Sequence, residues 1–163
     1  MNMLTSTYKW SNYIEAIIDD YRMQRIGGIV AAFEIWEMAV IPSLLNNSES
    51  WTEISSQTME DLEDLQFLFI RTILETGKPT SRIALLWETG LLGMEERISK
   101  RKLEFIDHIK ESDENTLVKK VFNEQLKQEW PGLIQECDKL CEDLELPKVS
   151  KNKLSKRDIN KGP

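Results

Sequence analysis

Hydrophobic positions recur with a helical period along most of the chain. Between residues 14 and 21, isoleucine and tyrosine side chains follow the i, i+3, i+4, i+7 rule, and a longer stripe runs from Met59 to Leu74. Further amphipathic segments cover residues 81–89, 94–110, 116–128 and 133–144. No window alternates with period two over the length of a strand. The pattern therefore predicts an all-α fold, a helical bundle of about six to seven helices.

Local signals predict several helix ends. Ser55 or Ser56 can cap the start of the helix that holds the Met59 stripe, and Gly77 is expected to close it. Gly90 suits the left-handed conformation that ends the 81–89 helix. Residues 29–45 are apolar nearly all round except for two glutamates, so we expect a central, buried helix that bends at Pro42.

Charge divides the chain into two parts. Residues 148–163 hold six basic residues and one acidic residue, whereas residues 1–147 carry a net charge of -12. With only three sizeable apolar side chains in the basic part, burial does not offset the entropy lost on ordering it. We therefore expect an N-terminal segment at 1–13, one helical domain at 14–147 and a disordered basic tail at 148–163.

Residues 26–45 are long enough to cross a bilayer core of about 30 Å as a helix. Glu34 and Glu37 would then lie near mid-span, where each acidic residue costs roughly 2.5 to 3.5 kcal/mol, so a buried bundle helix is favoured. The N-terminus has no apolar stretch after a basic start, and two cysteines are too few for a secreted disulfide scaffold. We expect an intracellular protein, in the nucleus or the cytoplasm, without a membrane partner.

The residues that could carry chemistry favour structural roles. Cys137 and Cys141 fall in one apolar helix stripe and, with the single His108, are fewer than the four ligands of a zinc site. His108 is expected at the surface. Asp19 and Asp20 lie on one helix without the third carboxylate that a two-metal site needs. We predict no catalytic residue, no metal ligand and no cofactor.

Three stretches of the sequence carry a family resemblance. They cover residues 20–51, 62–98 and 117–133, with Asp-Tyr-Arg at 20–22, Pro-Ser-Leu-Leu-Asn at 42–46 before Trp51, Leu65-Gln66 with Phe69 and Arg71, and Glu-Thr-Gly at 88–90 before Arg97-Ile98. In order and spacing, these motifs resemble the region after the palm in reverse transcriptases of invertebrate non-long-terminal-repeat retrotransposons. The resemblance spans roughly residues 16–149. Residues 1–13 do not look like the family, and Lys78-Pro79 departs from its usual proline placement.

The resemblance implies a helical thumb and linker, which clamp the template and primer as they leave the polymerase site. The palm, with its catalytic aspartates, would lie N-terminal to this region. We therefore expect a non-catalytic remnant of a reverse transcriptase and not an enzyme. By the same resemblance, the thumb would contact the nucleic-acid backbone through Arg22, Arg25, Arg71, Lys78 and Arg82.

The basic tail extends this expectation. Its cations Lys151, Lys153, Lys156 and Arg157 are candidates for phosphate contacts. The expected partners are RNA or an RNA/DNA template-primer, bound weakly and without specificity, and the rest of a reverse transcriptase. The alternative for each of these cations is a solvated side chain on an amphipathic helix. The alternative for the whole chain is a helical protein-interaction module, or a gene product with no retained activity.

Overall fold

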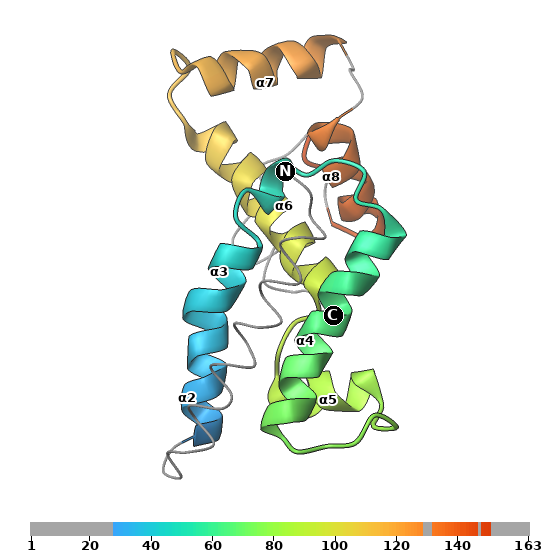
Figure 1. The fold of residues 1–163 in the computed structure, drawn as a ribbon. Helices are drawn as coiled ribbons and strands as arrows, with labels where there is room; N and C mark the ends of the chain where they lie inside the picture. Colours follow the sequence, from blue (N-terminus) through green and yellow to red (C-terminus); the bar gives the residue numbers. More distant parts are fainter. Residues whose placement is uncertain (1–27, 129–131, 147, 151–163) are drawn as a thin grey trace. The chain divides into compact units, whose positions relative to one another are not determined.

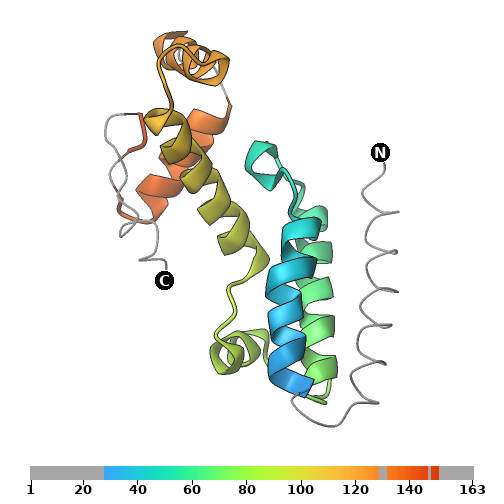
Figure 2. The same ribbon diagram turned by 90° about the vertical axis from the view of Figure 1, so that its left-hand side faces the viewer.

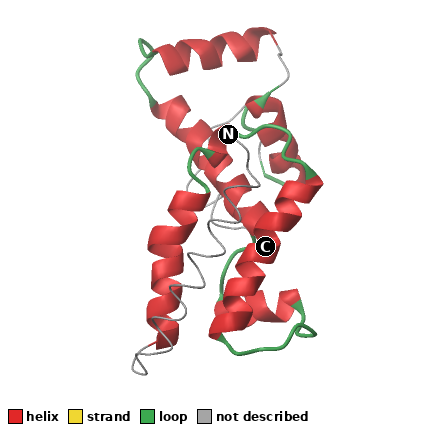
Figure 3. Cartoon of the chain, in the orientation of Figure 1, coloured by secondary structure: helices red, strands yellow, loops and turns green. Residues whose placement is uncertain are grey.

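The computed structural model describes residues 28–128, 132–146 and 148–150. Within these residues the chain consists of helices and loops, with no strand (Figure 3). The predicted all-α fold is confirmed. The predicted N-terminal segment and the helix expected from residue 14 lie outside the described residues.

The described residues form two compact units where the sequence predicted a single domain. The first unit holds residues 28–46 and 54–94, and the second holds residues 47–53 and those from 95 to 150. In the first unit the helices are α2 (Gly28–Ile35), the π-helix η1 (Trp36–Val40), α3 (Ile41–Leu44), α4 (Ser56–Ile73) and α5 (Arg82–Thr89) (Figure 1).

The expected irregularity near Pro42 lies in the turn before it. The Ile41 N–H bonds to the Trp36 carbonyl, five residues back, which makes Trp36–Val40 a π-helical turn. Because Pro42 has no N–H and its ring would collide with the carbonyl four residues earlier, a wider turn at this point relieves the clash. Pro42 then sits in the first turn of α3, where proline is tolerated.

The helical run from Gly28 to Leu44 is buried on one face only, which corrects the expectation of a helix buried all round. Its inward residues, with the following Leu45, are Ala32, Trp36, Val40, Ile41 and Leu45. Large apolar side chains on its outer face are exposed, namely Ile29, Val30 and Met38. Apolar composition alone did not distinguish these two faces.

Aromatic rings join this run to α4. Trp36 stacks on Phe69 with ring centroids 4.2 Å apart and an interplanar angle of 12°. Phe33 meets the same Phe69 edge-on, with centroids 5.6 Å apart. Figure 2 shows α2 and α3 running along α4. The core of the first unit is therefore built around stacked aromatic side chains, an arrangement that adds directional contacts to the burial of apolar area.

The ends of α4 follow the predicted signals in part. Ser55 is the N-cap, and its hydroxyl accepts a hydrogen bond from the Thr58 N–H at 3.1 Å. The helix ends at Ile73, before the expected Gly77, and Glu75 takes the left-handed conformation with φ of 51°. At α5 the prediction is confirmed, because Gly90 has φ of 66° and its N–H caps the helix.

The second unit is built from α6 (Met94–Glu111), of which the first residue belongs to the first unit, α7 (Leu117–Gln128) and α8 (Leu133–Asp143), with a short 3-10 turn at Ser48–Ser50. These helices match the predicted segments to within one residue at each end. Their buried core is aliphatic apart from one phenylalanine and two cysteines, and consists of Leu103, Ile106, Ile109, Phe122, Ile134, Cys137, Cys141 and Val149.

Residues 148–150 belong to this fold, although the sequence placed them in the tail. Val149 is fully buried in the core of the second unit. The Lys110 ammonium donates a hydrogen bond to its carbonyl. The next N–H, that of Ser150, donates to the Asp138 carboxylate at 2.9 Å. The remaining tail residues, 151–163, lie outside the described residues.

Across the described ranges, no helix is both long enough and apolar enough to span a membrane.

Candidate nucleic-acid interface

Three of the predicted phosphate contacts come together on the hairpin of α4 and α5. Arg71 lies in the last turn of α4, Arg82 opens α5, and Lys78 stands in the turn between them. That turn is closed by a hydrogen bond from the Thr80 N–H to the Gly77 carbonyl at 3.2 Å, and Lys78 is exposed. The other predicted contacts, Arg22, Arg25, Lys151, Lys153, Lys156 and Arg157, lie outside the described residues.

The two arginines share an aromatic ring. The guanidinium carbon of Arg71 lies 5.7 Å from the centroid of the Phe67 ring, and that of Arg82 lies 5.0 Å from it. Phe67 itself is only 2% exposed. Guanidinium groups at this distance are attracted to the face of an aromatic ring, so both side chains cover the phenylalanine and hold the hairpin closed.

Each arginine also has a polar partner within the hairpin. Arg71 donates a hydrogen bond to the Thr80 carbonyl at 3.4 Å. Arg82 forms an ion pair with Asp64 of α4, in which the side chains are 44% and 59% exposed. Arg71 therefore serves mainly the fold, and the charge of Arg82 is partly neutralised. Of the three cations, Lys78 and Arg82 are exposed and Arg71 is half-buried.

The loop after α5 is fixed by two polar residues of α4. The Gln66 side chain, which is fully buried, donates to the Leu92 carbonyl at 2.9 Å. Glu63 accepts a hydrogen bond from the Met94 N–H, the first residue of α6, at 2.6 Å. With Leu85 buried on its inner side, α5 is attached to α4 at both ends.

The outer face of α5 carries two large apolar side chains that were not among the residues predicted from the sequence. Ile83 is 79% exposed and Trp87 is 88% exposed. The sequence held a signal for them: the run from Ile83 to Trp87 is apolar at every position, more than one face of a two-turn helix can bury.

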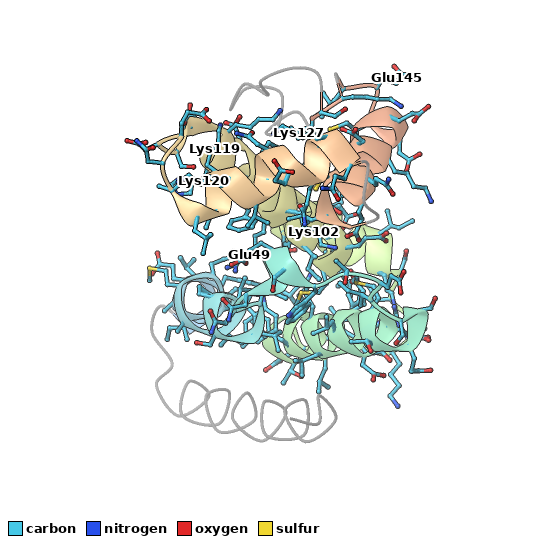
Figure 4. All side chains as sticks on the ribbon, turned by 90° about the horizontal axis from the view of Figure 1, so that it is seen from above. Glu49, Lys102, Lys119, Lys120, Lys127 and Glu145 are labelled. Carbon is cyan, nitrogen blue, oxygen red and sulfur yellow. The ribbon has the colours of Figure 1, made fainter. Side chains whose placement is uncertain are left out.

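In the second unit, buried lysines support the fold. The Lys102 ammonium lies 2.7 Å from a carboxylate oxygen of Glu136 and joins α6 to α8. Lys119 of α7 donates to the Lys110 carbonyl at 2.6 Å and so satisfies one of the open carbonyls at the end of α6. Figure 4 labels both lysines together with the exposed Lys120. The ammonium groups of Lys102 and Lys119 are therefore bonded to protein groups and not to solvent.

Burial also changes the acid-base behaviour of this unit. Desolvation lowers the pKa of Lys110, although the nearby carboxylates Asp107 and Asp138 act in the opposite direction. Burial raises the pKa of the Cys137 thiol to about 12 and also raises the pKa of Cys141. Thiols that stay protonated are poor nucleophiles and poor metal ligands. The prediction of core cysteines is confirmed.

One further expectation concerns a surface group. His108 is exposed, as predicted. Among the described residues, no group of three or more histidine, cysteine, aspartate or glutamate side chains is placed to hold a metal ion.

Comparison with known proteins gave no match among protein families, curated proteins or solved structures. The resemblance to retrotransposon reverse transcriptases therefore stays a prediction.

Proposed function

We propose that this chain is a helical module of the thumb-and-linker kind that contacts nucleic acid weakly, through phosphates, and has no catalytic activity of its own. The observation that carries the proposal is the position of Lys78, exposed in the turn of a hairpin whose ends are fixed, with the partly exposed Arg82 four residues further on. The turn of the hairpin falls inside the stretch 62–98, in which the family resemblance assigns backbone contacts to Arg71, Lys78 and Arg82.

Charge explains why the binding is expected to be weak. The described residues of the first unit include eight acidic and three basic residues, a net charge of -5. Arg71 is engaged with Phe67 and Thr80, and Arg82 also lies on Phe67 and is paired with Asp64, so at most Lys78 and the partly exposed Arg82 are left for phosphates. Two phosphate contacts on a single strand give a slope of log affinity against log salt of about -1.4. A steeper slope would require the basic tail.

The test measures fluorescence anisotropy of a labelled primed RNA template between about 50 and 200 mM salt. Four proteins are compared: the full chain, Lys78→Ala, the matched control Lys120→Ala, and a tail variant with serine at 151, 153, 156 and 157. Lys120 is also an exposed lysine, on α7 of the second unit. We expect Lys78→Ala to weaken binding and flatten the slope, and Lys120→Ala to leave both unchanged.

The tail variant separates the two sources of positive charge. If the hairpin contributes, this variant binds more weakly than the full chain, and a fifth protein that adds Lys78→Ala to the tail variant binds more weakly still. If Lys78→Ala and Lys120→Ala lowered the affinity equally, this would contradict the assignment of the binding surface to the α4–α5 hairpin. Absence of binding by the full chain at the lowest salt concentration would refute the proposed function.

A second function, protein interaction, is favoured by the outer face of α7. Leu117, Val118 and Val121 are 76%, 51% and 49% exposed, at a spacing suited to the groove of a partner. By resemblance, that partner would be the rest of a reverse transcriptase. Sedimentation of the full chain with a polymerase of the resembled family that lacks its thumb tests this. A complex that is lost on Leu117→Ser would support it, and no complex would refute it.

A further inference from the structure

Building on the proposed function, we infer that Trp87 is a stacking platform for an unpaired nucleobase, so that the α5 hairpin binds single-stranded nucleic acid in preference to duplex. The ligand of the hairpin is then single-stranded nucleic acid, and Trp87, which is not one of the predicted cations, binds it directly.

The geometry of α5 presents the indole to solvent. Trp87 and Ile83 are four residues apart and therefore lie on the same face of the helix. That face points away from the buried Leu85, and Ala84 beside it is exposed as well. An indole that is 88% exposed keeps a face free for contact with a planar ring.

The platform is held in place before any ligand binds. Arg71 fixes the turn before α5 through the Thr80 carbonyl, and the ion pair of Arg82 and Asp64 fixes its first residue. The Gln66 amide fixes the loop after it. Stacking on such a helix orders little of the protein, which keeps the entropic cost of binding low.

The size of the exposed surface favours a nucleobase over a protein. A large aromatic side chain buries about 150 to 250 Å² when it is fully covered. Trp87 and Ile83 are the large apolar side chains exposed on this helix, and their combined area is well below the roughly 800 Å² per partner that a stable protein interface buries. A single base covers about one indole, and base-aromatic stacking is the usual way in which proteins bind single strands without sequence specificity.

Charge gives the bound strand a direction. Lys78 lies in the turn at the N-terminal side of the platform, where its ammonium can contact a phosphate next to a stacked base, whereas Arg82 lies on the α4-facing side of α5 against Phe67 and Asp64. Glu88 borders Trp87 on the helix and is exposed, so it disfavours phosphates on the opposite side. Bases inside a duplex are already stacked on each other and offer no free face, and the duplex therefore has only the weak phosphate contacts.

The experiment uses the full chain with a labelled oligouridine and with the same strand paired to its complement. Anisotropy is measured for the wild-type protein, for Trp87→Ala and for the matched control Trp51→Phe, which changes a partly exposed tryptophan of the second unit. We expect Trp87→Ala to lower the affinity for the single strand about 5- to 150-fold, the effect of removing one base-aromatic stack. Duplex binding should stay the same, and Trp51→Phe should change neither.

A spectroscopic readout separates stacking from a structural role. Oligouridine should quench the tryptophan fluorescence of the wild-type protein, and the quenching should be lost in Trp87→Phe and kept in Trp51→Phe. Because Trp87 is 88% exposed, both substitutions at this position should leave the helical circular dichroism spectrum unchanged.

The outcomes distinguish this inference from the function on which it rests. If Trp87→Ala binds the single strand as well as wild type while Lys78→Ala binds it more weakly, the stacking inference is overturned and the phosphate-contacting function stands. Equal losses on single strand and duplex, or a change in self-association on sedimentation in place of a change in binding, also overturn it. Failure of the full chain to bind either ligand removes both proposals.

Discussion

The two units use their cationic side chains in different ways. In the first unit, the guanidinium groups of Arg71 and Arg82 lie against the ring of Phe67 at the edge of an aromatic core. In the second unit, Lys102 and Lys119 are buried in a largely aliphatic core, and each ammonium group is bonded to a carboxylate or a carbonyl. Both units thus use positive charge as part of the fold.

The difference follows from the chemistry of the two cations. A guanidinium group is planar and weakly hydrated, so it can lie on a ring and still direct donors elsewhere. An ammonium group is a compact, strongly hydrated charge, and its burial is tolerated only when acceptors replace the water. A count of lysines and arginines therefore overstates the charge that this chain can offer to phosphates. The exposed Lys78 is a better candidate for a phosphate contact than the buried lysines.

The largest loss of stability is expected when the aromatic core of the first unit is broken. Trp36→Ala removes a fully buried side chain and its stack on Phe69, and large aromatic truncations of this kind cost about 3 to 5 kcal/mol of unfolding free energy. Urea denaturation followed by circular dichroism measures the loss. Trp87→Ala is the matched control, since a residue so exposed should change the free energy of unfolding by less than about 0.5 kcal/mol.

The next effect tests the buried lysines of the second unit. Lys102→Ala removes the hydrogen bond to Glu136 together with a buried side-chain stem, and should cost about 2 kcal/mol. The cost stays below that of a fully buried ion pair because the Glu136 side chain is 34% exposed and water can solvate the freed carboxylate. Lys102→Met keeps most of the apolar stem and should cost about half as much.

Two controls relate this result to the first unit. Lys139→Ala changes an exposed lysine of α8, and Arg82→Ala breaks an ion pair whose partners are both more than a third exposed. The first should cost less than about 0.5 kcal/mol and the second at most about 1 kcal/mol. If Lys102→Ala were no more costly than Lys139→Ala, the buried lysine would not support the fold as described.

Much of the fold could be predicted from the sequence because its determinants are local. The helices at 81–89 and 133–144, the Ser55 cap and the left-handed Gly90 all depend on residues within a turn of one another. The burial of Cys137 and Cys141 followed from one helix stripe. Such features are set by side-chain spacing and backbone preference, which can be seen in the sequence alone.

The candidate site was predicted less completely because it depends on contacts between distant residues. Glu136, the partner of Lys102, is 34 residues away in the sequence, and the partner of Arg82 on α4 is 18 residues away. Sequence reasoning chose Arg71 and Arg82 by charge and could not show that both cover Phe67. Trp87 carries no charge and no ligating atom, so the choice of candidate residues by charge did not include it.

A third effect depends on pH and belongs to the second unit, which holds both cysteines of the chain. Burial raises the pKa of Cys137 from its ordinary value near 9 to about 12, so the folded state keeps this proton longer than the unfolded state. The stabilisation is complete below pH 9 and is lost as the pH rises towards 12. Burial of Lys110 acts in the opposite sense, because its lowered pKa makes stability rise with pH.

Comparison with Cys137→Ala isolates the thiol contribution. The unfolding free energy of the wild type, measured under reducing conditions, should fall by about 1 kcal/mol relative to that of the variant between pH 8 and pH 10. The contribution of Lys110 is common to both proteins and cancels in the difference. A difference that stays constant over this range would contradict the burial of the thiol.

The smallest effect concerns a helix ending that the two units share. At the end of α4, Glu75 is left-handed with φ of 51°, and the next N–H, that of Thr76, bonds to the Arg71 carbonyl at 2.9 Å. At the end of α8, Glu145 is left-handed with φ of 54°, and the N–H after it bonds to the Cys141 carbonyl at 2.7 Å. Both are Schellman endings with glutamate where glycine is usual.

Glycine should therefore stabilise each unit by a similar small amount. A side chain with a Cβ is strained in the left-handed region, at a cost of roughly 1 to 2 kcal/mol, and glycine recovers part of this while losing more backbone entropy on folding. We expect Glu75→Gly and Glu145→Gly each to raise the free energy of unfolding by about 0.5 to 1 kcal/mol, as measured by urea denaturation. Alanine at the same positions removes the charge but keeps the strained backbone, so it should give no gain. If alanine stabilised as much as glycine, charge would be the cause, and the shared helix ending would not be a point of strain in either unit.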